Sequence, residues 1–191
     1  MAGSAVLAHL LLVSSLISCA VCGKGGFYSY KVKNIRGKPV SLEAYRGMVS
    51  LVVNLASECG YTNEHYKELT DLYNELNVEK KEPFTVLGFP CNQFGQQEPH
   101  DNEDIEKFAR ETYKAPFPLF AKIDVTGTTA HSAYRYLTES SDKNPNWNFW
   151  KYLLDGNGKV IAAWGPRTDV KSIKGEVLKA IEKLKLSRRE L

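Results

Sequence analysis

Cysteine is scarce in this chain, which has four among 191 residues: Cys19, Cys22, Cys59 and Cys91. Cys19 and Cys22 form a C-x-x-C pattern typical of redox or zinc sites, but they lie in an N-terminal stretch that we expect to be removed. The mature chain then keeps Cys59 and Cys91, with Cys22 in addition if cleavage follows Ala20. So few cysteines exclude the disulfide framework of a small secreted domain. The two internal thiols are therefore buried, paired or used in chemistry.

The chain also lacks a strong excess of charge and any metal-ligand spacing. Its 25 Lys and Arg residues stand against 22 Asp and Glu residues, a formal net charge of +3, which is not the charge balance of a nucleic-acid-binding domain. His65, His100 and His131 are scattered, and no His or Cys cluster has zinc-site spacing. The Asp155-x-Asn157 pattern lacks the closing glutamate of a calcium loop and indicates a turn. We therefore expect no metal and no nucleic-acid partner.

The N-terminus has the pattern of a secretory signal. Residues 5–17 are almost entirely apolar or small and include no Asp, Glu, Lys or Arg, and they are too few for a membrane span of about 20 residues. Small residues at Ser18-Cys19-Ala20 predict a signal peptide over 1–20, with cleavage after Gly23 as the alternative. No Lys or Arg precedes the apolar stretch, which leaves an uncleaved anchor or a buried helix as the other interpretation. We expect no stable membrane insertion.

The last residues, Arg188-Arg189-Glu190-Leu191, resemble the Lys-Asp-Glu-Leu retrieval signal of the endoplasmic reticulum. Arg189 stands where an acid is usual. Together with the predicted signal peptide, the tail favours the lumen of the endoplasmic reticulum, with secretion as the alternative. The predicted organisation is a domain over 21–187 followed by a tail over 188–191, with no repeat or linker inside the domain.

The order of predicted elements indicates an α/β fold. Apolar residues make up 43% of the chain, enough to bury a core. The pattern resembles the thioredoxin-like architecture, a mixed central sheet flanked by helices on both faces. Strands are predicted at 50–56, 84–89, 149–154 and 160–164, an extended segment at 120–125, and helices around 69–76, 105–112, 130–137 and 170–184.

Cys59 lies directly after a predicted buried strand and just before a helix. A helix N-terminus offers unpaired N–H groups and partial positive charge, which favour the nucleophilic thiolate. Thr62 stands where thioredoxin has its second cysteine, so exchange within a local dithiol is excluded. We expect Glu58 to face solvent. From this setting alone, an inert buried cysteine is as good an interpretation as a reactive one.

Three motifs resemble those of the glutathione peroxidase family. Residues 54–60, N-L-A-S-E-C-G, resemble its N-V-A-S-x-C/U-G motif, where U is selenocysteine. Residues 88–99, G-F-P-C-N-Q-F-G-Q-Q-E-P, resemble the second motif, and 147–149, W-N-F, the third. The match runs from about 27 to 186 and is most similar to the cysteine-type members of the endoplasmic reticulum. It implies a thiol peroxidase that reduces hydrogen peroxide or organic hydroperoxides.

The resemblance places the family's catalytic tetrad on Cys59, Gln93, Trp147 and Asn148. Amide and indole N–H groups can hold a thiolate without titrating near neutral pH, and they stabilise charge as the O–O bond breaks. Attack on peroxide then leaves a sulfenic acid on Cys59. The competing interpretation is an aromatic core residue at Trp147 and turn amides at the other two positions.

The thiol that reduces Cys59 again is left open by the sequence. Cys91 follows the next predicted strand, close enough in principle for a disulfide, and is a candidate resolving cysteine. The second motif, however, resembles that of relatives in which this cysteine does not resolve. Glutathione and protein disulfide isomerases are the competing reductants, and no other cofactor is expected. The tetrameric members of the family carry an extra loop before the third motif, whereas the segment at 130–146 is short here, so the resemblance implies a monomer with an open site. A peroxide sensor that passes oxidation to partner proteins is the alternative function.

Overall fold

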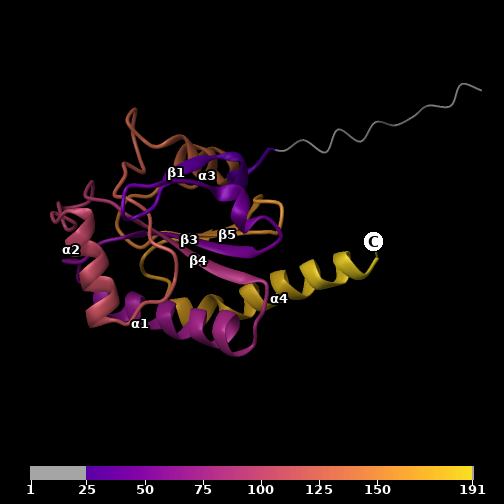
Figure 1. The fold of residues 1–191 in the computed structure, drawn as a ribbon. Coiled ribbons are helices and arrows are strands. Elements are labelled where there is room, and N and C mark those ends of the chain that lie inside the picture. The colour runs from indigo at the N-terminus through magenta and orange to yellow at the C-terminus, as the bar shows by residue number, and fades with distance from the viewer. Residues whose placement is uncertain (1–24, 191) are drawn as a thin grey trace, which may run out of the picture.

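A computed structural model describes residues 25–190 and contains a four-stranded mixed sheet (Figure 1). The strand order is β4-β3-β5-β6, where β3 pairs parallel with β4 and antiparallel with β5, and β5 pairs antiparallel with β6. A separate two-stranded sheet pairs β1 with β2. The strands are β1 (Lys31–Lys33), β2 (Pro39–Ser41), β3 (Val49–Leu55), β4 (Phe84–Pro90), β5 (Lys151–Leu154) and β6 (Val160–Trp164).

Helices cover both faces of the sheet, as predicted. The long helices α1 (Thr62–Tyr73) and α4 (Val170–Arg189) pack on one face, and α3 (Ser132–Ser141) lies on the other together with β1 and the N-terminal segment (Figure 1). The short helix α2 (Asn102–Lys107) stands beside the sheet. Short 3-10 turns occupy η1 (Phe27–Ser29) and η2 (Leu42–Tyr45), and π turns extend α1 and α2 as η3 (Asn74–Glu79) and η4 (Phe108–Thr112).

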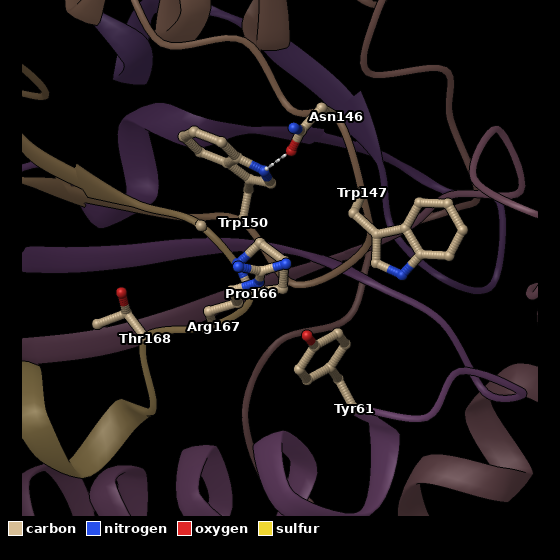
Figure 2. Close-up of a pocket in the computed structure, with 8 residues that line it drawn as sticks. Tyr61, Asn146, Trp147, Trp150, Pro166, Arg167 and Thr168 are labelled. Carbon is tan, nitrogen blue, oxygen red and sulfur yellow. Dashed lines mark hydrogen bonds between the residues drawn. The ribbon is translucent and has the colours of Figure 1, made fainter.

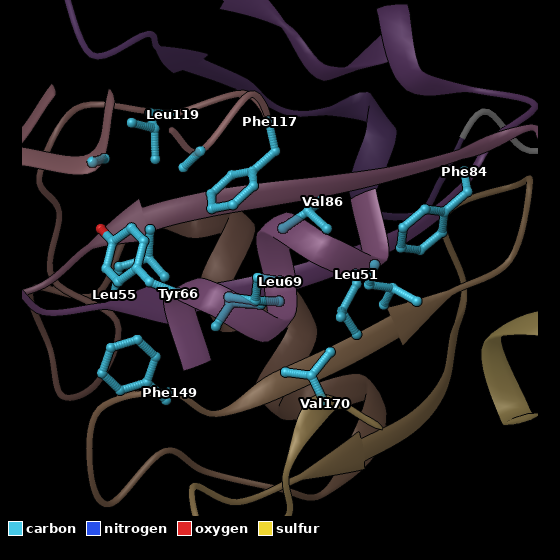
Figure 3. Close-up of a cluster of buried hydrophobic side chains, with 14 of the residues drawn as sticks. Leu51, Leu55, Tyr66, Leu69, Phe84, Val86, Phe117, Leu119, Phe149 and Val170 are labelled. Atoms are coloured by element: carbon cyan, nitrogen blue, oxygen red, sulfur yellow. The ribbon is translucent and has the colours of Figure 1, made fainter. Parts of the chain in front are cut away.

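Two cores result, because the side chains of β3 and β4 alternate between the faces. The α1-side core takes Leu51, Val53 and Leu55 of β3 together with the apolar stripes of α1 and α4 (Figure 3). The α3-side core takes Val52 of β3 with the buried face of α3. Both central strands are buried along their whole length, which explains why their sequences are continuous apolar runs.

The predicted turn between the last two strands is confirmed, and α2 begins at a side-chain cap. The Asp101 side chain accepts hydrogen bonds from the backbone N–H groups of Glu103 and Asp104, and so caps α2. The turn at 155–158 joins β5 to β6. Helix α4 continues to Arg189, so it includes the first residues of the retrieval-like tail, and the Arg188 guanidinium donates to the Gly47 carbonyl.

The predicted extended segment at 120–125 belongs to no strand of the sheet, and one predicted strand is shorter than expected. Residues 121–125 form no strand, because their backbone groups pair singly with separate segments: Ala121 N–H with Lys33 and Ile123 N–H with Pro90. Strand β5 begins at Lys151 rather than Phe149, because Phe149 has a left-handed backbone with φ of 63°.

The predicted signal peptide, with Cys19 and Cys22, lies outside the described residues, as does Leu191. Within 25–190, none of the helices has both the length and the apolar character needed to cross a membrane.

Candidate active site

The three motifs, which are far apart in the sequence, meet at one end of the sheet. Strands β3 and β4 are parallel, so residues that follow Leu55 and Pro90 emerge at the same end. Strand β5 runs antiparallel to β3, so the residues before Lys151 arrive there from the opposite direction. Backbone and side-chain bonds join the segments: Glu58 N–H donates to the Gln97 carbonyl at 3.0 Å, and Ser57 Oγ donates to Glu98 Oε1 at 2.6 Å.

Cys59 lies between β3 and α1 with 8% of its surface exposed. Thr62, the first residue of α1, fixes this junction. Its Oγ1 accepts from Cys59 N–H at 3.1 Å and donates to the Ala56 carbonyl at 2.7 Å, and its own N–H donates to the Cys59 carbonyl at 2.9 Å. The thiol therefore sits at the N-terminal end of a twelve-residue helix.

Glu58 faces solvent, as predicted. Its side chain is 52% exposed and Oε1 lies 3.0 Å from Nε2 of His100. The carboxylate is therefore directed away from the core that contains Cys59.

Asn148 is fully buried, and it contacts a glutamine that sequence reasoning did not select. Its Nδ2 donates to Gln97 Oε1 at 2.9 Å and to the Phe94 carbonyl at 3.3 Å. The bond to Oε1 orients the Gln97 amide and leaves its Nε2 without a partner among residues 25–190. Gln97 thus presents an available donor beside the segment that contains Cys59.

Gln93, the glutamine predicted for the tetrad, directs its amide toward the segment at Val125 and Thr126. Its side chain is exposed, and its amide is used to hold the segment at Val125 and Thr126. Oε1 accepts from both backbone N–H groups at 2.7 and 3.0 Å, and Nε2 donates to the Thr126 carbonyl at 3.0 Å. Gln93 thus braces this loop through Oε1 and one Nε2 hydrogen. Both glutamines lie in the second motif, and the sequence did not show which of them would contact Asn148.

Trp147 is 38% exposed and packs over Phe94 and Gly95. Its indole N–H makes no hydrogen bond to any described residue. The ring borders an open cleft of about 670 Å³, and Figure 2 shows the side chains around it, with Trp150 donating to Asn146 at 2.9 Å. The cleft is lined by Tyr61, Asn146, Trp147, Trp150, Gly165, Pro166, Arg167 and Thr168.

Cys91 and Cys59 are both free, and the structure does not bring them together. Cys59 belongs to the α1-side core and Cys91 to the α3-side core. Cys91 has no exposed surface, and burial raises the pKa of its thiol to about 11. Little of the Cys91 thiol is therefore ionised near neutral pH, which makes Cys91 a poor nucleophile.

Glu98 is a further buried group that sequence reasoning missed. It has no exposed surface, and burial raises the pKa of its carboxyl to about 7, although the Ser57 hydroxyl bond opposes the shift. Lys122 braces the same turn by donating to the carbonyls of Glu98 and His100 at 3.0 and 2.6 Å. The position of Glu98 between Gln97 and Pro99 does not indicate, from the sequence alone, that its side chain is buried.

Among the described residues, no cluster of three His, Cys, Asp or Glu side chains could hold a metal ion.

Comparison with known proteins shows the family of the chain. The sequence model for glutathione peroxidase matches residues 27–138. Glutathione peroxidase 7 of Bos taurus is 55% identical over 177 residues, which cover 92% of this chain and 94% of that protein.

Solved structures resemble the whole fold. The crystal structure of T. cruzi GPX1 superposes with a TM-score of 0.67 at 34% identity, covering 83% of this chain and 97% of that one. A thiol:disulfide interchange protein of the thioredoxin family from Chlorobium tepidum gives a TM-score of 0.60 at 16% identity, over 80% and 93% of the two chains. The second likeness concerns the fold alone, which is thioredoxin-like as predicted.

Proposed function

Because this chain belongs to the glutathione peroxidase family, and is thus an oxidoreductase acting on peroxide, we propose that it reduces hydrogen peroxide or organic hydroperoxides through a sulfenic acid on Cys59. One observation carries the proposal. Cys59 lies at a strand–helix junction, its neighbour Glu58 is bonded to the Gln97 backbone, and the side-chain N–H donors of Gln97 and Trp147 have no other partner among residues 25–190.

The first step is a displacement at oxygen. The Cys59 thiolate attacks one peroxide oxygen, an S–O bond forms, and the O–O bond breaks. The departing oxygen takes a proton and leaves as water or alcohol, and Cys59 is oxidised to the sulfenic acid. Donors aimed at the developing charge stabilise the transition state without reorganising.

We assign the donor roles to Gln97 Nε2 and Trp147 Nε1. Asn148 acts on Gln97, because its Nδ2 bond to Oε1 fixes which end of the Gln97 amide is available. We assign to Gln97 the role that the family resemblance implied for Gln93, whose Oε1 and one Nε2 hydrogen are engaged at Val125 and Thr126.

For the reductive half, we favour an external thiol. The burial and raised pKa of Cys91 disfavour it as the resolving cysteine, whereas the cleft beside Trp147 is open. A first thiol condenses with the sulfenic acid to give a mixed disulfide and water. A second thiol then releases the Cys59 thiol and a disulfide. Glutathione or the C-x-x-C site of a protein disulfide isomerase supplies these thiols to a monomeric enzyme.

The oxidative half is tested by stopped-flow mixing of the reduced protein with hydrogen peroxide, followed by mass spectrometry. Cys59→Ser should abolish oxidation, and Cys91→Ser, the matched control, should retain the first step. A Cys59→Ser variant that consumes peroxide at the wild-type rate would refute the proposal.

The reductant is identified by steady-state turnover with glutathione and, separately, with a reduced protein disulfide isomerase. Turnover with either one supports the enzyme. Fast Cys59 oxidation without turnover by either would favour the sensor function. A Cys59–Cys91 disulfide after one equivalent of peroxide would restore Cys91 to the mechanism.

We also propose that the protein acts in the lumen of the endoplasmic reticulum, on the basis of the signal-like N-terminus and the tail at 188–191. Retention is tested by expressing the full chain with and without its last four residues. Equal secretion of both forms would show that the tail is not read and would leave secretion as the location.

A further inference from the structure

Phe149, the residue after Asn148, is fully buried and has a left-handed backbone with φ of 63°. Residues with a bulky side chain rarely adopt this conformation, because Cβ approaches the neighbouring carbonyl. Such a conformation persists only where the surroundings hold it. Phe149 lies between Asn148 and β5, and its left-handed backbone turns the chain there. The contacts that hold Phe149 therefore also determine the orientation of the Trp147 and Asn148 side chains.

Asn54 of β3 brackets this turn from the sheet side. Its carbonyl accepts from Phe149 N–H at 2.8 Å, and its Oδ1 accepts from Trp150 N–H at 2.9 Å. Its Nδ2 donates to the Trp147 carbonyl at 3.1 Å. One fully buried side chain thus binds the backbone on both sides of the left-handed residue.

Lys151 is the second partner, and it has no exposed surface. Its Nζ donates to the Phe149 carbonyl at 2.8 Å and to the Gly165 carbonyl at 3.1 Å. Burial lowers the pKa of Lys151 to about 7, while Asp169 and Glu68 act in the opposite direction. The amine donates whether or not it is charged, so the two bonds do not require the ammonium form. An apolar side chain here would leave the buried Phe149 carbonyl and the partly buried Gly165 carbonyl without their present donor.

His65 of α1 is the third partner. Its ring stacks on Phe149 with centroids 5.0 Å apart and planes at 10°, and its Nε2 lies 2.9 Å from the Pro166 carbonyl. Burial, reinforced by Lys151, lowers the pKa of His65 to about 4, so the ring is neutral and Nε2–H donates. Lys151 and His65 therefore both join Phe149 to the 165–168 loop, which lines the cleft together with Trp147 (Figure 2).

We propose that Asn54, Lys151 and His65 are positioning residues that hold Phe149 in its left-handed conformation and thereby fix Trp147 and Asn148 at the Cys59 site. None of the three has a hydrogen bond to Cys59 within residues 25–190, so they act through the loop. The inference rests on the proposed function, because it assigns these residues a part in Cys59 oxidation. It adds that the segments at 146–150 and 165–168, which line the cleft, are joined through the left-handed residue Phe149.

Lys151→Met is the direct test, since it keeps the length of the side chain and removes the donor. Two measurements are made on the reduced full chain: hydrogen exchange of the 147–150 amides, and the rate of Cys59 oxidation across pH. We expect exchange at Phe149 and Trp150 to accelerate at least about tenfold. The plateau oxidation rate should fall by about ten- to a hundredfold, the range that small misplacements of reacting groups produce. The midpoint of the pH profile should not move.

Two controls separate positioning from general destabilisation. Lys159→Met alters an exposed lysine of the same hairpin and should leave both readouts unchanged. Leu137→Ala weakens the α3-side core and should lower stability without slowing oxidation of the folded protein. If Lys151→Met does not fold, His65→Phe replaces it, because it retains the stack and loses only the Pro166 bond. It should give smaller changes in the same direction.

Wild-type exchange and wild-type plateau rates in the Lys151 or His65 variant would overturn the inference. A shifted pH midpoint with an unchanged plateau would also overturn it, because Lys151 would then act on the thiolate by its charge. The proposed function fails separately, if wild-type Cys59 does not react with peroxide. In that case the exchange measurement still decides whether the three residues hold the loop.

Discussion

At the scale of single residues, the two glutamines of the second motif illustrate what decides a role. Gly95 and Gln96 both have left-handed backbones, with φ of 65° and 53°. These two residues turn the chain between Gln93 and Gln97, so the two side chains reach different neighbours. The residue types were evident from the sequence, but the direction of each amide depends on this turn.

The assignment predicts different outcomes for two alanine variants. Gln97→Ala should slow Cys59 oxidation by about a hundredfold, the lower end of the loss for one transition-state donor. Gln93→Ala should change the rate less than about threefold, because its amide braces a loop, although it should lower stability. Stopped-flow oxidation with hydrogen peroxide measures both. A larger loss in Gln93→Ala than in Gln97→Ala would return the role to Gln93.

Cys91 gives a second prediction at this scale. Because it is fully buried and its pKa is raised to about 11, the native reduced protein at pH 8 should incorporate iodoacetamide at Cys59 and not at Cys91. Peptide mass spectrometry after brief labelling distinguishes the thiols, and a sample in urea should label both. Equal native labelling would show that Cys91 becomes accessible in the folded protein, which would favour a resolving role.

At the scale of elements, the junction between β3 and α1 is the part of the site that the sequence predicted best. The buried run of β3, followed by Cys59 and a helical stripe, indicated a thiol at a helix N-terminus. The sequence did not indicate that Thr62, which replaces a second cysteine, would bind Cys59 and Ala56 through its hydroxyl. The residue that excludes thioredoxin-type exchange also fixes the position of the remaining thiol.

Thr62→Val is expected to destabilise the protein by about 1–3 kcal/mol, because it leaves buried backbone groups unpaired while keeping the side-chain shape. Thr62→Ser retains the hydroxyl and should lose less than about 1 kcal/mol. Urea unfolding of the reduced proteins measures the difference. Equal midpoints for the Val and Ser variants would show that the hydroxyl does not hold the junction.

At the scale of the whole molecule, the mixed sheet brings three distant segments to one place. The parallel β3–β4 pair and the antiparallel β5 are both required, because a parallel β5 would deliver Trp147 and Asn148 to the other end. Glu98 is fully buried where these segments meet, and its carboxyl accepts a hydrogen bond from Ser57.

Burial of Glu98 predicts a pH-dependent stability. The carboxyl has an ordinary pKa of 4.5 and a folded value of about 7, so between these values the folded state holds a proton that the unfolded state releases. The resulting stability is complete below pH 4.5 and is lost as pH rises to about 7. Glu98→Gln does not ionise, so it should gain up to about 3 kcal/mol relative to wild type over this range.

Denaturant unfolding at pH 5 and pH 8 measures this difference. Comparison of the variant with wild type removes the contribution of His65, whose lowered pKa makes stability rise with pH over part of the same range. Glu103→Gln, at an exposed acid of α2, is the matched control. A constant difference between Glu98→Gln and wild type at both pH values would contradict the prediction.

The sequence by itself determined the elements, the fold class and the reactive residue types. Apolar runs, helical stripes, caps and a turn depend on neighbours along the chain, and they predicted the mixed sheet and its flanking helices. Tertiary structure alone decided which glutamine reaches Asn148, that Cys59 and Cys91 enter different cores, and that Phe149 leaves the predicted strand. These features depend on the direction of side chains across long-range contacts, which residue type and spacing do not encode locally.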